Sequence, residues 1–256
     1  MDLGIKGKWA LVGGASKGLG RGCAEALAGE GVNVLMVARG AEALAQAAAE
    51  IRAACAGGTG AEVQFVAADI TTPEGRAAVF AVRRDFDIVV TNAGGPPPGS
   101  FRDWDREAWI KAIDANMLTP IELIKATIDG MLARGFGRIV NMSSRAALGK
   151  ELRTAYSATK AGLIGMTRVW ALELGAHGIT ANAIGPGPTR TALFDKANPP
   201  GAPRTQAIID AVPVKRVGTP DDVAHALAFL LNARSGFITG QVLYVCGGMT
   251  VGVAGV

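Results

Sequence analysis

The sequence predicts an α/β protein with a single seven-stranded parallel sheet and helices on both faces, a doubly wound fold. Short, nearly continuous apolar runs alternate along the chain with longer segments of helical spacing. Strands that are apolar on both sides are typical of parallel sheets covered on both faces. The chain has 256 residues, 49% hydrophobic and 19% charged. This length and composition suit a single domain over residues 1–256 and exclude a disordered chain.

The expected elements follow one another in regular order. Seven apolar runs are predicted as strands, at residues 9–13, 32–38, 63–67, 87–91, 138–142, 179–184 and 241–245. Six segments are predicted as helices, at residues 19–30, 41–54, 73–84, 105–134, 156–176 and 221–232. Right-handed crossovers between such strands give the doubly wound arrangement. Two proline-rich pieces, at 94–99 and 198–203, follow the fourth and sixth predicted strands and are interpreted as loops at a functional site.

Composition and charge exclude several classes of function. Lys and Arg number 26 against 22 Asp and Glu, and the basic residues are scattered, so we expect no nucleic-acid partner. Three distant cysteines and two histidines form no disulfide framework or metal site. No apolar stretch reaches the roughly 18 residues that span a bilayer, and the N-terminus does not resemble a secretory signal. We therefore expect a cytoplasmic protein with no metal and no membrane partner.

A glycine-rich turn follows the first predicted strand and opens the first predicted helix. Its sequence is Gly14-Ala15-Ser16-Lys17-Gly18-Leu19-Gly20. Glycines at these positions let backbone N–H groups and a helix N-terminus approach a pyrophosphate without Cβ clashes. The alternative is a purely structural turn. In this position the motif predicts a dinucleotide site, with contacts from Gly14, Ser16, Lys17, Gly18, Leu19 and Gly20.

The end of the second predicted strand bears on the choice between NAD and NADP. Proteins that bind NAD usually place an acidic residue about 20 positions past the glycines, where it binds the ribose 2′-hydroxyl. This chain has Ala38 and Arg39 there. Arg39 can bind a 2′-phosphate with two hydrogen bonds, and Lys17 adds a second cation nearby. The sequence therefore favours NADP(H); NAD(H) and two merely solvated basic side chains are the alternatives.

Further motifs lie after later strands and in the helices between them. They are Asp69-Ile70, Asn92-Ala93-Gly94, Asn116, Ser143-Ser144, Tyr156-Ser157-Ala158-Thr159-Lys160, Asn182 with Pro186-Gly187, and Gly247-Gly248. With them, the chain from Gly14 to Gly248 resembles the short-chain dehydrogenase/reductase family in its compact single-domain form, and is similar to its 3-oxoacyl-acyl-carrier-protein reductases. The resemblance implies a Rossmann fold and an oxidoreductase that transfers a hydride between a nicotinamide cofactor and a carbonyl or secondary alcohol.

Tyr156 and Lys160 are the expected proton-transfer pair. They are four positions apart and so share one face of a helix. A free tyrosine has a pKa near 10 and is a poor acid–base catalyst at neutral pH. A nearby ammonium lowers that pKa, so we expect Lys160 to lower the pKa of Tyr156. The resemblance also implies that Lys160 contacts the nicotinamide ribose. A surface pair on a dimerisation helix is the alternative.

The resemblance assigns the remaining site residues. It gives Ser144 the substrate oxygen and Asn116 a water that links Lys160 to solvent. Counting back from Tyr156 would select Ser143, whereas reading forward along the strand selects Ser144. Only one of two neighbouring residues on an extended strand can face the ligand, and we prefer Ser144. The cofactor site further includes Asp69, Ile70, Asn92, Ala93, Gly94, Pro186, Gly187, Thr189 and Thr191.

Two rival functions remain open at this point. One is a nucleotide-binding regulatory protein that has lost catalysis, although both Tyr156 and Lys160 are present. The other is an enoyl reductase, but such relatives place the tyrosine and lysine further apart. The resemblance also implies a dimer or tetramer formed through the two longest helices, at 105–134 and 156–176.

Basic residues gather in two segments expected on the substrate side, 145–155 and the first part of a substrate loop at about 188–212. The first segment contains three basic residues, Arg145, Lys150 and Arg153, and one acidic residue. The second also contains three basic residues, Arg190, Lys196 and Arg204, and one acidic residue. A positive rim of this kind steers anionic substrates toward a cleft. Solvated loop charges are the alternative.

Overall fold

The computed structural model describes residues 2–92, 94–95 and 98–251. Its seven strands are β1 (Trp9–Gly13), β2 (Asn33–Ala38), β3 (Val63–Ala67), β4 (Ile88–Thr91), β5 (Gly137–Met142), β6 (Ile179–Pro186) and β7 (Val242–Val245). They form one sheet in the order β3-β2-β1-β4-β5-β6-β7, and every neighbouring pair is parallel. The predicted doubly wound parallel sheet is confirmed. The strand order reverses between β1 and β4, which is where such sheets open a ligand crevice.

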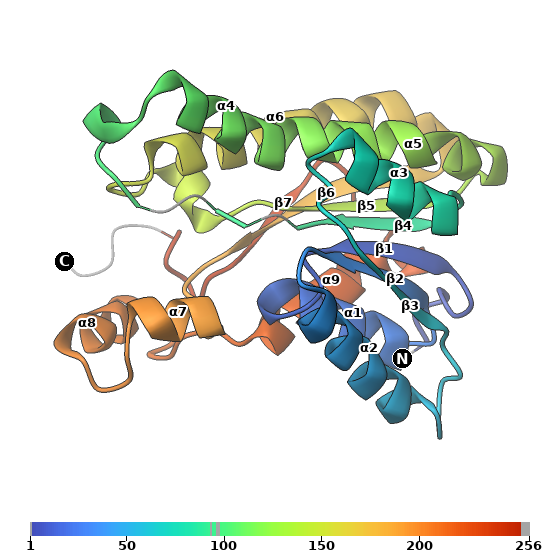
Figure 1. The fold of residues 1–256 in the computed structure, drawn as a ribbon, viewed down its shortest axis with the longest axis horizontal. Helices are drawn as coiled ribbons and strands as arrows, with labels where there is room; N and C mark the ends of the chain where they lie inside the picture. Colours follow the sequence, from blue (N-terminus) through green and yellow to red (C-terminus); the bar gives the residue numbers. More distant parts are fainter. Residues whose placement is uncertain (1, 93, 96–97, 252–256) are drawn as a thin grey trace.

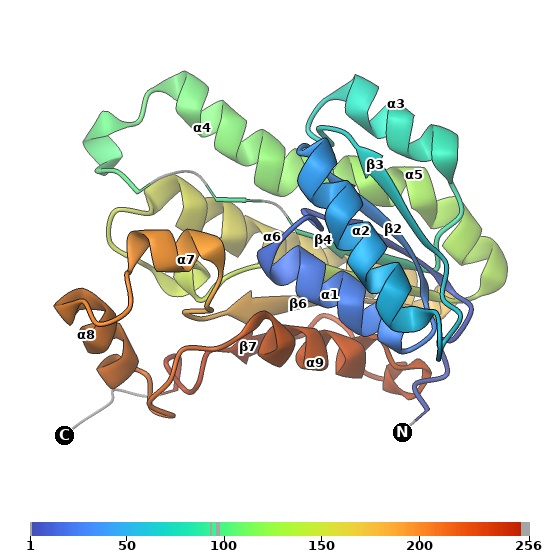
Figure 2. The ribbon, with the colours of Figure 1, turned by 60° about the horizontal axis from the view of Figure 1, so that its bottom comes forward.

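Helices cover both faces of the sheet. They are α1 (Gly18–Gly29), α2 (Ala41–Cys55), α3 (Pro73–Val82), α4 (Arg106–Ile113), α5 (Thr119–Arg134), α6 (Thr154–Leu174), α7 (Ala192–Ala197), α8 (Pro203–Ala211) and α9 (Pro220–Leu231). Figure 1 shows α1, α2 and α9 on one face and α3 to α6 on the other. After a rotation, α1, α2 and α9 come forward (Figure 2).

The strands are apolar on both sides because the sheet has a core on each face. Successive residues of a strand point to opposite faces. Ala10 and Val12 of β1 therefore belong to the core beneath α1 and α9, while Leu11 belongs to the core beneath α5 and α6. All three are almost fully buried.

Two expectations about the helices need correction. The single helix expected at 105–134 is interrupted by a π-helical turn, Asp114–Leu118, in which the Thr119 N–H donates to the carbonyl of Asp114 five residues earlier. The segment 188–212 is also more regular than a loop, since it contains α7 and α8. Pro203, interpreted as part of a loop, opens α8 because proline suits the first turn of a helix.

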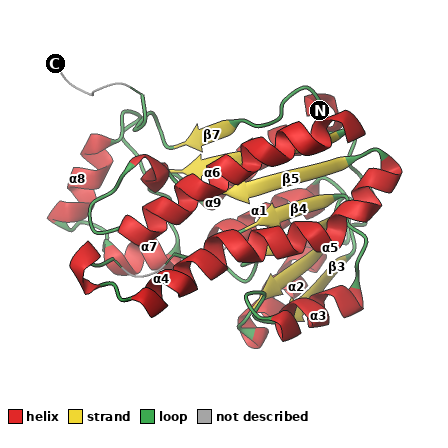
Figure 3. Ribbon diagram, turned by 90° about the horizontal axis from the view of Figure 1, so that it is seen from above, coloured by secondary structure: helices red, strands yellow, loops and turns green. Residues whose placement is uncertain are grey.

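The expected site residues follow the carboxyl ends of the strands. Figure 3 shows β4 to β7 pointing toward the end of the molecule where α7 and α8 lie. The turn after β1, the segments after β4 and β5, and the segment between β6 and α7 all meet there. Across the described residues, no helix has both the length and the apolar character needed to cross a membrane.

Candidate active site

The glycine turn after β1 has a shape that only glycine permits. Gly14 and Gly18 have φ angles of 60° and 58°, in the left-handed region that side chains disfavour. A Cβ on Gly20 would overlap the Gly14 carbonyl oxygen and lie 2.7 Å from that of Gly13. Helix α1 begins here without a side-chain cap and without an acidic residue in its first turn. Its first N–H groups therefore suit an anion.

Two cations stand at the outer edge of this turn, Arg39 and Lys17. The Arg39 side chain is 82% exposed, and its Nη1 lies 3.9 Å from Asp69 Oδ2. Asp69 Oδ1 accepts hydrogen bonds from the N–H and hydroxyl of Thr71, at 3.0 and 2.8 Å. Burial raises the pKa of Asp69, but these hydrogen bonds and the charge of Arg39 outweigh it and leave the pKa below its ordinary value. Asp69 is therefore ionised at neutral pH, beside a cationic edge.

The segment after β4 closes the other side of the turn. The Asn92 side-chain amide donates to the Gly13 carbonyl at 3.2 Å, and Ile70 Cδ1 would lie 3.5 Å from a Cβ on Gly13. Gly94 is exposed. Ala93, also expected here, lies outside the described residues. Asn92 thus ties the ends of β1 and β4 together at the switch point.

Ser144 and Tyr156 meet at the other end of the site. Ser144 Oγ accepts a hydrogen bond from the Ala146 N–H at 3.1 Å, and Ser144 acts on Tyr156 by lowering the pKa of its hydroxyl. The buried Ser143 hydroxyl instead donates to the Lys160 carbonyl at 2.9 Å. Ser143 thus anchors α6 and is also the serine among the residues that line the cleft, so the choice of Ser144 for the substrate oxygen stays a prediction.

The expected lowering of the Tyr156 pKa by Lys160 is wrong in this structure. Burial raises the pKa of Tyr156, and the Ser144 hydrogen bond and the charge of Arg153 offset this only in part. Lys160 Nζ lies 5.7 Å from the centre of the tyrosine ring and donates to the Met142 carbonyl at 2.6 Å. Burial also lowers the pKa of Lys160 to about 8. Sequence spacing placed the pair on one helix face but could not reveal that Lys160 is buried and Tyr156 half-buried.

Asn116 lies in the π-helical turn with one unsatisfied atom. Its Nδ2 donates to the Ala112 carbonyl at 3.0 Å, while its Oδ1 is buried without a hydrogen-bond partner among the described residues. A buried carbonyl of this kind usually binds water or a ligand group. π-Helical turns occur frequently at functional sites. The arrangement fits the expected water-binding role.

A buried polar chain that sequence reasoning missed fixes the helix that carries Tyr156. Thr91 Oγ1 donates to Asn141 Oδ1 at 2.7 Å, and Asn141 Nδ2 donates to Thr167 Oγ1 at 2.8 Å. These residues belong to β4, β5 and α6. An asparagine inside an apolar strand was the available signal, because a buried amide needs partners.

The segment after β6 turns back toward the glycine turn. The buried Pro186 ends β6, and a Cβ on Gly187 would lie 2.7 Å from Cys246. Thr189 Oγ1 donates to the Gly187 carbonyl at 3.2 Å. Thr191 caps α7 by accepting from the Phe194 N–H, and its methyl would lie 3.3 Å from a Cβ on Gly18.

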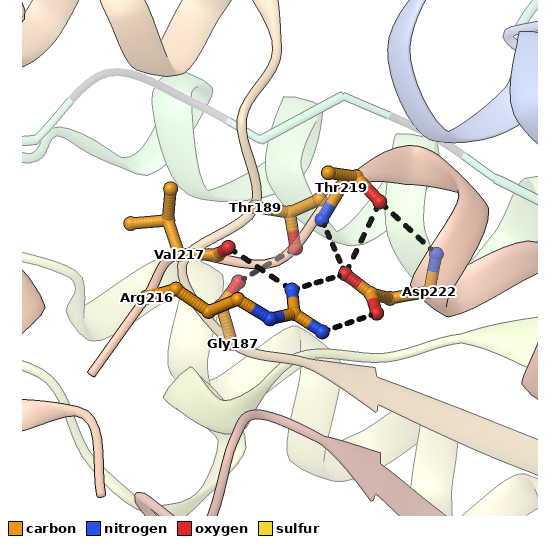
Figure 4. A network of polar contacts seen from close by, with 6 residues as sticks. All are labelled: Gly187, Thr189, Arg216, Val217, Thr219 and Asp222. Atoms are coloured by element: carbon orange, nitrogen blue, oxygen red, sulfur yellow. Dashed lines mark hydrogen bonds and ion pairs between the residues drawn. The ribbon is translucent and has the colours of Figure 1, made fainter. Parts of the chain in front are cut away.

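A second network, also missed from the sequence, holds this segment in place (Figure 4). Arg216 makes two hydrogen bonds to the Asp222 carboxylate, both at 2.7 Å, and the Thr219 N–H donates to the same group. The Arg216 guanidinium and these bonds hold the pKa of Asp222 well below its usual range. Gly218 exchanges backbone hydrogen bonds with the segment at Pro188 and Arg190, at 2.9 and 2.8 Å. The capping pattern Thr219-x-x-Asp222 was the available signal.

One cleft of about 1400 Å³ connects these parts. Its lining includes the predicted residues Gly14, Ser16, Lys17, Gly18, Leu19, Arg39, Asp69, Ile70, Asn92, Gly94, Asn116, Tyr156, Lys160 and Thr191. Gly20, the last residue of the glycine turn, is not among the lining residues, and Pro186, Gly187 and Thr189 lead toward Thr191. No group of three or more potential metal ligands exists in the described part of the chain. The cleft therefore brings the glycine turn and the Tyr156 end into one space.

Comparisons with known proteins cover nearly the whole chain. The family described as Enoyl-(Acyl carrier protein) reductase matches residues 14–250. The chain is 36% identical to a (2S)-((R)-hydroxy(phenyl)methyl)succinyl-CoA dehydrogenase subunit of Thauera aromatica, over 97% of this chain and 99% of the relative. It is 34% identical to a 3-oxoacyl-acyl-carrier-protein reductase of Vibrio cholerae, over 96% and 99% of the two chains.

Solved structures agree with these relatives. A short chain dehydrogenase/reductase family protein superposes with a TM-score of 0.85 at 37% identity, over 98% of this chain and 100% of the other. The L-sorbose reductase of Gluconobacter frateurii, solved in complex with NADPH and L-sorbose, superposes with a TM-score of 0.92 at 31% identity, over 99% and 100% of the two chains.

Proposed function

Because the chain belongs to the short-chain dehydrogenase/reductase family of NAD(P)-dependent oxidoreductases, we propose that it interconverts a carbonyl compound and a secondary alcohol with NADP(H). The observation that carries this proposal is that Tyr156 and Lys160 line the same cleft as the glycine turn. One space thus accommodates an elongated dinucleotide and a proton donor at its end.

The residues at the glycine turn fit a dinucleotide. Gly20 leaves room for close backbone approach, and the α1 N-terminus offers its N–H groups to a pyrophosphate. Arg39 and Lys17 would hold a 2′-phosphate, which supports NADP(H) over the alternative, NAD(H). Asp69, Asn92 and Thr191 would contact the rest of the cofactor, and the family pattern adds Ala93. When bound, the cofactor supplies the hydride for reduction or accepts it in oxidation.

The chain's own residues supply the proton. Tyr156 donates its hydroxyl proton to the substrate oxygen in reduction, and the phenolate takes it back in oxidation. Ser144 binds the same oxygen. Because burial raises the pKa of Tyr156, the hydroxyl keeps its proton at neutral pH, which suits the reducing direction.

Proton resupply falls to Lys160 and Asn116. Lys160 is buried, and its pKa of about 8 lets it release a proton close to neutral pH more readily than an ordinary lysine does. The unsatisfied Asn116 Oδ1 provides a place for a water between this lysine and solvent. Lys160 and Asn116 both line the cleft, so the residues proposed to resupply the proton lie in the same space as the residue that donates it.

The second candidate function is the reduction of C=C bonds. It is favoured by the description of the matching family as an enoyl reductase. NADPH consumption measured with a ketone panel and an enoyl-thioester panel separates the two. We expect turnover of ketones, with NADPH preferred over NADH. Turnover confined to enoyl thioesters would refute the carbonyl assignment.

We also propose self-association through α5 and α6. These helices expose apolar side chains, among them Leu132, Val169 and Leu172, the last 85% exposed. Exposed apolar groups on neighbouring helices are typical of protein interfaces. Light scattering should give a dimer or tetramer, and a monomer at micromolar concentration would contradict this. The single-domain organisation and the cytoplasmic location stay predictions.

A further inference from the structure

Thr119 has a buried hydroxyl to which the site as described so far gives no role. The residue follows the π-helical turn Asp114–Leu118 and is the first residue of α5. It is 2% exposed, and its Oγ1 is buried without a hydrogen-bond partner among the described residues. Because an unpaired hydroxyl in the interior costs free energy, such a group usually binds a water molecule or a ligand.

Other buried threonines of the neighbouring helices satisfy their hydroxyls within the helix. Thr127 of α5 donates to the Leu123 carbonyl at 3.0 Å, and Thr167 of α6 donates to the Leu163 carbonyl at 2.8 Å. A bond to the carbonyl four residues earlier is a common choice for a threonine inside a helix. Thr119 instead follows a turn whose backbone bond reaches five residues back, and its hydroxyl makes no such bond to a described residue.

A small cavity lies beside this hydroxyl. Its volume is about 10 Å³, close to the smallest space that accommodates one water molecule. Asn116, Thr119 and Lys160 line both this cavity and the main cleft, so the two spaces adjoin. Leu123 and Leu163 form part of the remaining wall. A buried water needs several polar partners, and the three shared residues bring such groups to one apolar cavity.

The three polar groups complement one another as partners of a single water. Asn116 Oδ1 is a carbonyl oxygen and can only accept, while the Thr119 hydroxyl can donate. Lys160 Nζ donates to the Met142 carbonyl at 2.6 Å and as an ammonium has further N–H donors. A water that donates one hydrogen to Asn116 Oδ1 and accepts from the Thr119 hydroxyl has its second hydrogen free for the amine form of Lys160.

We propose that Thr119 is a positioning residue whose hydroxyl, together with Asn116 Oδ1, binds one water molecule beside Lys160. This inference rests on the proposed function. After Tyr156 gives its proton to the substrate oxygen, Lys160 supplies the replacement, and the resulting amine takes a proton from the water. The Thr119 hydroxyl, which donates to the water oxygen, stabilises the negative charge that develops there. The water then regains a proton from the solvent of the adjoining cleft.

Thr119→Val removes the hydroxyl at nearly constant volume. In steady-state reduction of a ketone with NADPH, we expect kcat to fall about fivefold, the effect of losing roughly one hydrogen bond, with little change in the KM for the ketone. Thr119→Ser keeps a hydroxyl and should restore kcat. Thr127→Val removes an equally buried hydroxyl from the same helix and should leave kcat unchanged. An unaltered kcat in Thr119→Val, or no recovery in Thr119→Ser, would overturn the inference.

A single-turnover measurement separates this role from a structural one. The first proton comes from Tyr156 itself, so the enzyme–NADPH complex mixed with ketone should oxidise its bound NADPH equally fast in Thr119→Val and in the unmodified protein. A single turnover slowed as much as kcat would show that the substitution distorts the site, and would overturn the inference. No oxidation of NADPH by the unmodified protein with any ketone would instead refute the proposed function.

The water itself can be tested without turnover. A high-resolution crystal structure of the unmodified protein should show an ordered water within hydrogen-bond distance of Thr119 Oγ1 and Asn116 Oδ1, and that of Thr119→Val should lack it. Replacing a dry, unpaired hydroxyl with a methyl group stabilises a protein, whereas replacing one bonded to water does not. The melting temperature of Thr119→Val should therefore not exceed that of the unmodified protein. A higher melting temperature, or a crystal structure without this water, would count against the proposal.

Discussion

The two ends of the cleft are built by different means. At the cofactor end, the decisive feature is the absence of side chains: Gly20 admits no Cβ beside the Gly13 and Gly14 carbonyls, and the helix N-terminus behind it has no side-chain cap. At the substrate end, side chains on connecting segments contribute, such as Arg153, whose guanidinium carbon lies 5.8 Å from the centre of the Tyr156 ring. Backbone fit is hard to alter, whereas exposed charges can be exchanged one at a time.

This difference teaches where each property of the enzyme resides. Changes at the glycine turn should affect cofactor binding and folding together, because the same backbone contacts serve both. Changes to charged side chains on these segments should affect substrate choice with little effect on stability. Tyr156 lies at the substrate end and should affect only the chemical step. The following predictions test this division, beginning with the largest expected effect.

Tyr156→Phe should lower turnover at least about a hundredfold, because the general acid is removed. NADPH affinity should stay nearly normal, since the ring and its packing remain. Steady-state kinetics and fluorescence titration measure the two quantities. Tyr244→Phe, at the only other tyrosine, lies on β7 and should retain turnover. Unaltered turnover in Tyr156→Phe would remove Tyr156 from the mechanism.

Gly20→Ala should lower the free energy of unfolding by about 1–3 kcal/mol, because the new Cβ forces the turn apart, and should weaken NADPH binding. Gly29→Ala in the same helix has open space around its Cβ and should be neutral or stabilising by up to about 1 kcal/mol. Urea unfolding with and without NADPH compares them. Similar stability in both variants would show that the close backbone contacts of Gly20 do not determine the structure at the cofactor end of the cleft.

Arg39→Ala should weaken NADPH binding by about 1–3 kcal/mol, the usual loss when one partner of a charged hydrogen bond is deleted. The low end of this range is expected because the side chain is 82% exposed. NADH affinity should hardly change, and Arg84→Ala, in the exposed segment between α3 and β4, should change neither affinity. If the unmodified protein binds NADH at least as tightly as NADPH, the assignment of Arg39 to the 2′-phosphate is wrong.

Asp222→Asn tests the smallest effect, at the ion pair that holds the segment after β6. The folded protein keeps the Asp222 pKa below its ordinary value, so the carboxylate stabilises the fold fully above about pH 4 and loses that contribution as the pH falls further. We expect a melting temperature lower by roughly 1–3 °C at neutral pH, with the difference disappearing in acid. Asp221→Asn, in the same helical turn, is the control. A difference that persists at pH 2 would point to packing instead of charge.

Sequence reasoning succeeded where spacing alone fixes geometry. Tyr156 and Lys160 share a helix face at any burial, and the glycine turn has its place between a strand and a helix. Sequence reasoning failed where a property depends on residues that are distant in the chain. The pKa of Tyr156 depends on burial, which the spacing does not encode, and the Asn141 chain depends on partners from β4 and α6. Helices α7 and α8 were missed because prolines and charges near them resemble a loop.

The π-helical turn at Asp114–Leu118 has a consequence for how this enzyme could diverge. The turn accommodates one residue more than a regular α-helix would. Each α-helical residue advances about 100° around the axis, so winding the same residues as a regular α-helix would rotate α4 relative to α5 by about that amount. Trp109 and Lys111 of α4, the latter a cleft residue, would then face a new direction while the Tyr156 helix stayed in place. Deleting one residue of the turn would instead restore regular winding and leave α4 facing as it does, so the wide turn sets the direction of this part of the cleft wall.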